Sequence, residues 1–276
     1  MKSEEIKQMV KEKYSAIALQ EEGDTSSCCG ATCSSDEIYN IMTDDYTGVE
    51  GYHKEADLAL GCGLPVQFAK IKKGDVVLDL GSGAGNDCFV ARAETGAEGK
   101  VIGVDMTEAM IERARANAEK LGYNNVEFRL GDIEHLPLTK ESVNVIVSNC
   151  VLNLVPDKQK AFSEMFRVLK AGGHFSVSDI VLKDELPAEL LTVAEMYAGC
   201  ISGAVLLDDY LKMIKDAGFE NITVQKQKKV IVPDDILEKY LNADAVQKFK
   251  SVGEGILSIT VFAEKTKSCC DGNCCS

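Results

Sequence analysis

A regular alternation of short apolar runs and amphipathic segments begins near residue 75, and it constrains the fold more than any other feature of the sequence. The apolar runs are typical of strands that are covered on both faces, and the segments between them have the apolar spacing of helices. The expected strands are Val76–Leu80, Lys100–Asp105, Val126–Leu130, Val143–Asn149 and residues 174–182. This rhythm predicts an α/β fold with a doubly wound, mostly parallel sheet.

The segments on either side of this rhythm predict smaller parts. Loose apolar spacing over residues 2–20 indicates an N-terminal helix. Later patterns favour helices near 188–198 and 208–217, a strand over 222–232 and a last strand near 256–263, which suggest a small C-terminal α+β subdomain. We therefore expect an N-terminal helix with a cysteine-containing loop (1–35), a central domain (36–205), the small subdomain (206–266) and a flexible cysteine-rich tail (267–276).

The charge and hydropathy patterns exclude two classes of partner. The net charge is −14, from 44 acidic and 30 basic residues, and no stripe of Lys and Arg interrupts the acidity, so a nucleic acid would be repelled. No segment has the roughly 20 consecutive apolar residues that a membrane span requires, and the first residues do not resemble a signal peptide. We expect a cytoplasmic protein that binds neither nucleic acid nor membranes.

The chain has eleven cysteines, an odd number. In a reducing compartment, many cysteines more often serve metal binding, redox work or catalysis than a disulfide framework. Cys62, Cys150 and Cys200 stand alone in apolar or glycine-rich settings, which suggests that thiols hold the substrate. Cys88 lies on the helix after a glycine-rich loop, and we expect it to be an ordinary buried core residue.

The glycine-rich loop, DLGSGAGND over residues 79–87, follows a strand and opens a helix. Its glycines permit a tight turn and let a ligand approach backbone N–H groups at the helix N-terminus. A dinucleotide fingerprint would require glycine at position 86, where this chain has Asn86, and Asp79 would place a carboxylate near a pyrophosphate. S-adenosylmethionine fits better, because its sulfonium and amino groups are cationic and it has no phosphate.

Acidic residues also close the next two strands. Asp105 lies at the usual distance for accepting hydrogen bonds from ribose hydroxyls, and Asp132 and Ile133 can flank an adenine. The residues expected to bind the cofactor are Asp79, Gly81, Ser82, Gly83, Gly85, Asp105, Met106, Asp132, Ile133 and Asn149.

Together the motifs DLGSGAGND, GVDMT, SNCVLNLVPDK, LGCGLP and GCISGA resemble those of the arsenite S-adenosylmethionine methyltransferases, from about residue 52 to residue 204. The resemblance implies a class I methyltransferase fold and transfer of methyl groups from S-adenosylmethionine to arsenite and methylarsenite. On the matching positions, Cys62, Cys150 and Cys200 would be the arsenic ligands. Cys33, or the pair Cys28 and Cys29, would stand where the family keeps a further redox-active cysteine.

The implied chemistry suits these side chains. Trivalent arsenic is soft and thiophilic, and three thiolates leave it one lone pair. That lone pair carries no proton, so methyl transfer needs no general base and depends mainly on positioning. We accordingly expect His53, His135 and His174 to be surface or strand-end residues rather than catalytic ones.

Methylation raises the formal oxidation state of arsenic, so each further turnover requires two electrons. We expect Cys33 to help provide them by forming a disulfide with a ligand cysteine, with regeneration by thioredoxin or a small thiol. The tail CC-DGN-CC has enough thiols for zinc but lacks the usual C-x2-4-C spacing, and it is either an arsenite-capturing segment or dispensable.

Two other functions compete with arsenite methylation. The first is a methyltransferase of a small organic substrate such as a quinone, for which the absence of Trp and the few aromatic residues near the motifs are unfavourable. The second is a non-catalytic, thiol-based metalloid-binding protein. The acidic strand ends at Asp105 and Asp132 make this function less favourable, because they indicate an intact cofactor site.

Overall fold

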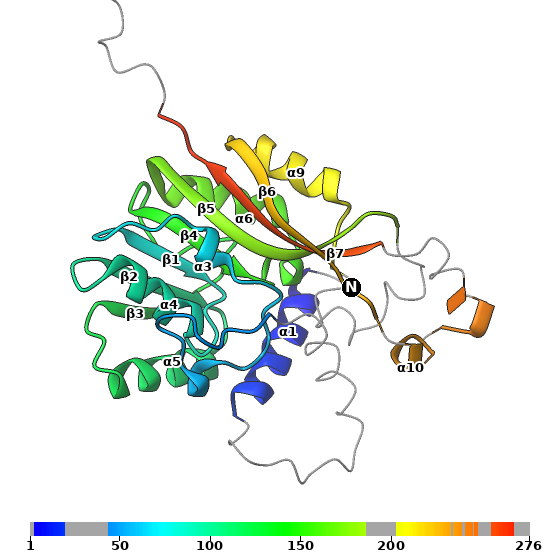
Figure 1. The fold of residues 1–276 in the computed structure, drawn as a ribbon, viewed down its shortest axis with the longest axis horizontal. Coiled ribbons are helices and arrows are strands. Elements are labelled where there is room, and N and C mark those ends of the chain that lie inside the picture. The colour runs from blue at the N-terminus through cyan, green and yellow to red at the C-terminus, as the bar shows by residue number, and fades with distance from the viewer. Residues whose placement is uncertain are drawn as a thin grey trace, which may run out of the picture.

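The computed structural model describes residues 3–19, 44–185, 203–232, 234–238, 241–244, 246–247 and 255–267 (Figure 1). Its centre is a seven-stranded sheet in the order β3-β2-β1-β4-β5-β7-β6. The strands are β1 (Val76–Leu80), β2 (Lys100–Asp105), β3 (Val126–Leu130), β4 (Val143–Asn149), β5 (Leu169–Leu182), β6 (Glu220–Lys229) and β7 (Ile256–Glu264). Strands β1 to β5 pair in parallel, which confirms the predicted doubly wound α/β fold.

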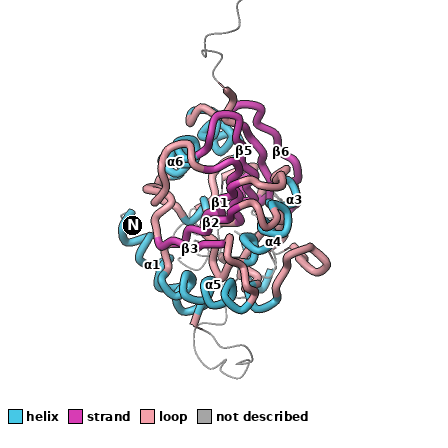
Figure 2. The backbone as a smooth tube through the Cα atoms, turned by 90° about the vertical axis from the view of Figure 1, so that its left-hand side faces the viewer, coloured by secondary structure: helices cyan, strands magenta, loops and turns pink. Residues whose placement is uncertain are grey.

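Helices cover both faces of this sheet (Figure 2). They are α1 (Ser3–Ala18), α3 (Pro65–Phe68), α4 (Asn86–Thr95), α5 (Glu108–Lys120), α6 (Lys158–Val168), α9 (Leu207–Asp216) and α10 (Asp234–Leu237), with short 3-10 turns η1 (Lys54–Ala56) and η2 (Leu152–Leu154). Among the described helices, none is long and apolar enough to cross a membrane.

Successive side chains of the parallel strands are buried on opposite faces of the sheet, as the pleat of a strand requires. In β1, Val77 packs into a cluster with residues of α4 and α5, such as Phe89 and Ile111. Its neighbour Leu78 belongs to the opposite cluster, with residues of α6 and α9. Both faces are therefore apolar, which explains why the strands read as nearly continuous hydrophobic runs.

The expected C-terminal subdomain forms no second sheet in the described residues. Strand β7 pairs antiparallel with β5 from His174 opposite Glu264 to Leu182 opposite Ile256, and β6 pairs antiparallel with β7 at the edge. The physical reason is burial, because all but the last residue of β7 are buried and need cover on both faces. Strands β6 and β7 therefore extend the central sheet.

Several expected elements lie outside the described residues. They are the cysteine-containing loop up to residue 35, the helix expected near 188–198, and the tail beyond residue 267. Strand β5 also begins five residues earlier than the expected residue 174, because Leu169 already pairs with Val143 ahead of an irregularity in the register.

Candidate active site

The glycine loop connects β1 to α4 through a backbone conformation that residues other than glycine adopt only with strain. Gly81, Gly83 and Gly85 all have positive φ angles, of 67°, 50° and 101°. A Cβ atom on Gly85 would also lie 2.9 Å from ring carbons of both Phe89 and Phe128. A Cβ on Gly83 would meet no atom within 4 Å, so this part of the loop faces open space that a ligand can use.

Asp105 fixes this loop to the end of β2. Its Oδ2 atom accepts a hydrogen bond from the N–H of Gly83 at 3.0 Å, and its Oδ1 atom accepts one from the N–H of Thr107 at 2.8 Å. Burial raises the pKa of Asp105, while these hydrogen bonds act in the opposite direction. Asp105, the acidic residue at the end of β2, thus holds the glycine loop in place.

A cavity opens at this carboxyl edge of the sheet, where ligands of open α/β folds bind. Every residue that we expected to bind the cofactor lines it except Gly85. The buried Oγ atom of Ser82 has no hydrogen-bond partner in the described structure, although it lines the cavity. Such an orphaned polar atom is usually satisfied by a ligand or by water.

The cavity is acidic. Five aspartates line it, namely Asp57, Asp79, Asp87, Asp105 and Asp132, and Lys7 is the only Lys or Arg among its described lining residues. Burial raises the pKa of Asp87 to about 6, against hydrogen bonds from Tyr46 and Asn149. Burial, reinforced by the charge of Asp87, raises the pKa of Asp79 well above its usual range. A cationic ligand would relieve this clustering of carboxylates.

Helix α1 closes one side of the cavity, to which it contributes Lys7, Val10 and Tyr14. The Nζ atom of Lys7 lies 2.6 Å from Oδ2 of Asp132 and 2.5 Å from Oε2 of Glu134. Lys7 could not be recognised as a site residue from the sequence, because 125 residues separate it from Asp132 and no local pattern links the two.

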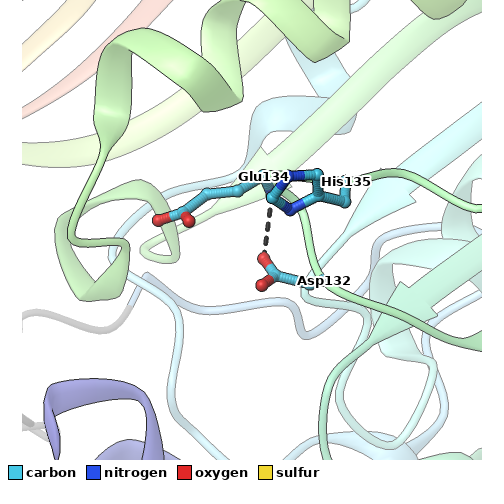
Figure 3. Close-up of side chains that lie close together, drawn as sticks. All are labelled: Asp132, Glu134 and His135. Carbon is cyan, nitrogen blue, oxygen red and sulfur yellow. Dashed lines mark hydrogen bonds between the residues drawn. The ribbon is translucent and has the colours of Figure 1, made fainter. Parts of the chain in front are cut away.

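Figure 3 shows Asp132 and Glu134 close to His135, with a hydrogen bond from the N–H of Glu134 to Oδ1 of Asp132 at 2.8 Å. These three side chains could together contact a cation. The ammonium group of Lys7 already contacts both carboxylates, so in this structure it supplies the positive charge of the cluster.

Cys150 directly follows β4 and lines the cavity. Its φ angle of 61° lies in the left-handed region, which costs a residue other than glycine roughly 1 kcal/mol or more. Its N–H donates to the carbonyl oxygen of Ser178 in β5 at 2.8 Å, which holds this conformation in place. A strained cysteine beside a cavity is a candidate functional residue.

Cys62 is fully buried and belongs to the same apolar cluster as Cys150. Its N–H donates to Oδ1 of Asn149 at 2.9 Å, and its carbonyl oxygen accepts a hydrogen bond from Oγ of Ser258 at 2.6 Å. The structure therefore brings two of the three expected ligand cysteines to one end of the sheet. The third, Cys200, lies outside the described residues, as do Cys28, Cys29, Cys33 and the tail cysteines.

Cys88 is fully buried, as expected of a core residue. Its Sγ atom donates to Oδ2 of Asp79 at 3.2 Å, a hydrogen bond that no sequence pattern predicts. None of the three histidines lines the cavity. His53 contacts the hydroxyl of Tyr123 at 3.2 Å, and Nε2 of His174 lies 2.6 Å from the carbonyl oxygen of Ala69.

The glycine loop, the acidic strand ends and a cavity at the carboxyl edge together define a class I, S-adenosylmethionine-dependent methyltransferase. Residues 71–218 match the family described as "Methyltransferase domain". The chain belongs, more narrowly, to the arsenite methyltransferase family, as its relatives demonstrate. It is 42% identical over 275 residues to an arsenite methyltransferase of Halobacterium salinarum, and this match covers 95% of this chain and 67% of that protein.

Two further relatives agree. An arsenite methyltransferase of Aquipseudomonas alcaligenes is 34% identical, over 83% of this chain and 67% of that protein. Among solved structures, an arsenic (III) S-adenosylmethionine methyltransferase from Chlamydomonas reinhardtii superposes with a TM-score of 0.63 and 31% identity. That match covers 84% of this chain and 74% of the solved one.

Proposed function

We propose that this protein transfers methyl groups from S-adenosylmethionine to trivalent arsenic bound by cysteine thiolates, and thereby detoxifies arsenite. The observation that carries the proposal is the position of Cys150, which lines the predicted cofactor cavity and shares an apolar cluster with Cys62. A thiophilic substrate held there would lie beside the methyl donor.

The cavity residues suit S-adenosylmethionine, which when bound supplies a methyl group on a cationic sulfonium. Asp79 and Asp87 line the cavity, where the ionised carboxylate of Asp87 would supply negative charge for a cationic ligand, and Asp105 would accept hydrogen bonds from ribose hydroxyls. Asp132 and Ile133 would flank the adenine, and the unpaired hydroxyl of Ser82 would gain a partner.

The arsenic site would consist of the thiolates of Cys62, Cys150 and Cys200. Soft sulfur ligands match arsenic better than oxygen or nitrogen ligands do, and the apolar cluster around Cys62 and Cys150 limits access of water to the bound substrate. Because the arsenic lone pair is the nucleophile, the absence of a histidine from the cavity lining fits the reaction. Arsenite and methylarsenite would be successive substrates.

Each transfer leaves arsenic two oxidation states higher, so a reductant must act before the next one. We assign this role to Cys33, with Cys28 and Cys29 as alternatives. The formation of a disulfide between two thiols would give arsenic the two electrons, and thioredoxin or a small thiol would then reduce that disulfide. This cycle suits a reducing compartment, the cytoplasm.

The test is an incubation of the purified protein with labelled S-adenosylmethionine, a thiol reductant and arsenite, followed by separation of the arsenic species. We expect labelled methylarsenicals, and none when arsenite is omitted. Arsenite binding without transfer would instead indicate a non-catalytic metalloid-binding protein. In a parallel incubation that contains a quinone in place of arsenite, transfer of the label to the quinone, together with no transfer to arsenite, would indicate a methyltransferase of small organic substrates.

A further inference from the structure

The side chain of Asn149, the last residue of β4, is completely engaged by protein groups. Its Oδ1 atom accepts hydrogen bonds from the N–H groups of Cys62 at 2.9 Å and Gly63 at 3.2 Å. The two hydrogens on its Nδ2 atom are shared among three acceptors, which are the carbonyl oxygen of Gly63 at 2.8 Å, the hydroxyl of Tyr46 at 2.8 Å and Oδ2 of Asp87 at 3.1 Å. An amide group with two acceptor lone pairs and two hydrogens has no capacity left for a ligand.

These partners also fix which way round the amide lies. The carbonyl oxygen of Gly63 and the carboxylate of Asp87 can only accept, so the amide nitrogen must face them. Tyr46 reinforces this arrangement, because its hydroxyl donates to Oδ1 of Asp87 at 2.6 Å. The amide oxygen is consequently directed at the backbone N–H of Cys62.

The glycines beside Cys62 have a role in the same contact. A Cβ atom on Gly61 would lie 2.5 Å from Nδ2 of Asn149, and one on Gly63 would lie 2.5 Å from Oγ of Ser178. Only a backbone without side chains at both positions can approach β4 and β5 this closely. The sequence Gly61–Cys62–Gly63 is thus a requirement of the docking of this loop onto the sheet.

Asn149 also directly precedes Cys150. The end of β4 therefore lies next to one expected arsenic ligand, Cys150, and binds the loop that carries another, Cys62. We propose that Asn149 is a positioning residue, which sets the place of the Cys62 thiol relative to the Cys150 thiol. This inference rests on the proposed arsenic site. It departs from the role in cofactor binding expected from the sequence, because the hydrogen bonds of the Asn149 side chain serve the loop.

The test compares Asn149→Ala with the unaltered protein in three measurements, which are the dissociation constants of arsenite and of S-adenosylmethionine, the number of As–S bonds by X-ray absorption, and the alkylation rate of Cys62. Loss of an outer partner of a ligand typically weakens metal binding by roughly 10- to 100-fold. We expect arsenite affinity to fall by about that factor, the As–S number to fall, and Cys62 to be alkylated faster. The affinity for S-adenosylmethionine should change much less.

Asn144→Ala is a matched control on the same strand. Its side chain also links neighbouring elements, since Oδ1 accepts from the N–H of Val76 at 3.1 Å and from Nζ of Lys170 at 3.0 Å. Asn144 lies near the amino end of β4, whereas Asn149 lies at its carboxyl end. This variant should lose a similar amount of stability without a change in arsenite affinity or in the reactivity of Cys62.

Gly61→Ala disturbs the same contact from the loop side and serves if Asn149→Ala fails to fold. It should reproduce the loss of arsenite affinity and the faster alkylation of Cys62. Unchanged arsenite affinity and alkylation in either folded variant would overturn the inference, and so would an equal loss of affinity for S-adenosylmethionine. Alkylation is measured without arsenic, so it tests the positioning of Cys62 even if the protein proves unable to methylate arsenite.

Discussion

The hydroxyl of Tyr210 donates to Oδ2 of Asp179 at 3.2 Å, and both residues are fully buried. Burial raises the pKa of Asp179 to about 7, although the charge of Lys158 and the hydrogen bonds from Ile180 and Tyr210 oppose the rise. The pair joins β5 to α9. Because the pKa of this carboxyl group is higher in the folded protein than in the unfolded chain, it makes the stability of the protein depend on pH.

We predict that Asp179 makes the folded state less stable as the pH rises from about 4 to about 7. In that interval the folded protein keeps a proton that the unfolded chain, with its usual carboxyl pKa, has lost, so folding takes up a proton. The contribution to the free energy of unfolding falls by at most roughly 4 kcal/mol across the interval. Urea unfolding of wild type and Asp179→Asn at several pH values measures it, and parallel pH profiles would contradict the prediction.

A second prediction concerns the closure of the cavity by α1. Lys7→Gln removes both ion pairs to Asp132 and Glu134, which should loosen the helix and raise the dissociation constant for S-adenosylmethionine by roughly 3- to 10-fold. Lys11→Gln is the matched control, since Lys11 lies one turn later and pairs with the exposed Glu108. Calorimetric titration should show little change for Lys11→Gln, and equal effects of the two variants would argue against the closure.

The third prediction separates the ligand thiols from the core thiol. Serine at Cys62, Cys150 or Cys200 should reduce arsenite methylation by more than the roughly 10- to 100-fold expected for the loss of an outer partner, with cofactor binding retained. Cys88→Ser, which keeps a donor for Asp79, should retain most of the activity. Product analysis and cofactor titration on the four variants provide the measurement. Methylation at the wild-type rate by any of the three would remove that cysteine from the ligand set.

The fourth prediction follows from the raised pKa of Asp87, about 6. Above that value its carboxylate is ionised and attracts a cation, whereas below it the group is neutral. Affinity for S-adenosylmethionine should therefore rise between pH 5 and 7, by no more than about tenfold per pH unit. The rise should be smaller for S-adenosylhomocysteine, whose sulfur is neutral, and it should flatten in Asp87→Asn. Identical pH profiles for the two ligands would contradict an electrostatic role of this carboxyl group.

The parallel core and the cofactor loop could be predicted because their determinants are local. A buried parallel strand is an apolar run, and the turn after β1 requires glycine at positions with positive φ. Asp105 follows from its place at the end of the next strand. These features depend on a few consecutive residues, so they can be predicted without knowledge of distant contacts.

The features that the sequence did not reveal depend on contacts between distant segments. Lys7 becomes a cavity residue only because α1 packs across the end of β3, and Tyr46 becomes one through its hydrogen bond to Asp87. Asp87 stands in the glycine motif itself, but its importance arises from burial, which the motif does not encode. The pairing of β7 with β5 is likewise non-local, and for this reason the C-terminal strands were expected in a separate subdomain.

The hydrogen bond from Ser258 to the carbonyl oxygen of Cys62 joins residues 196 positions apart. During synthesis, the loop of Cys62 would therefore leave the ribosome long before β7 exists to hold it. A nascent chain would present this thiol without its final support, and the full set of contacts would form only when the sheet closes on β7. Competence to bind a thiophilic substrate in the native geometry would thus be acquired late in folding.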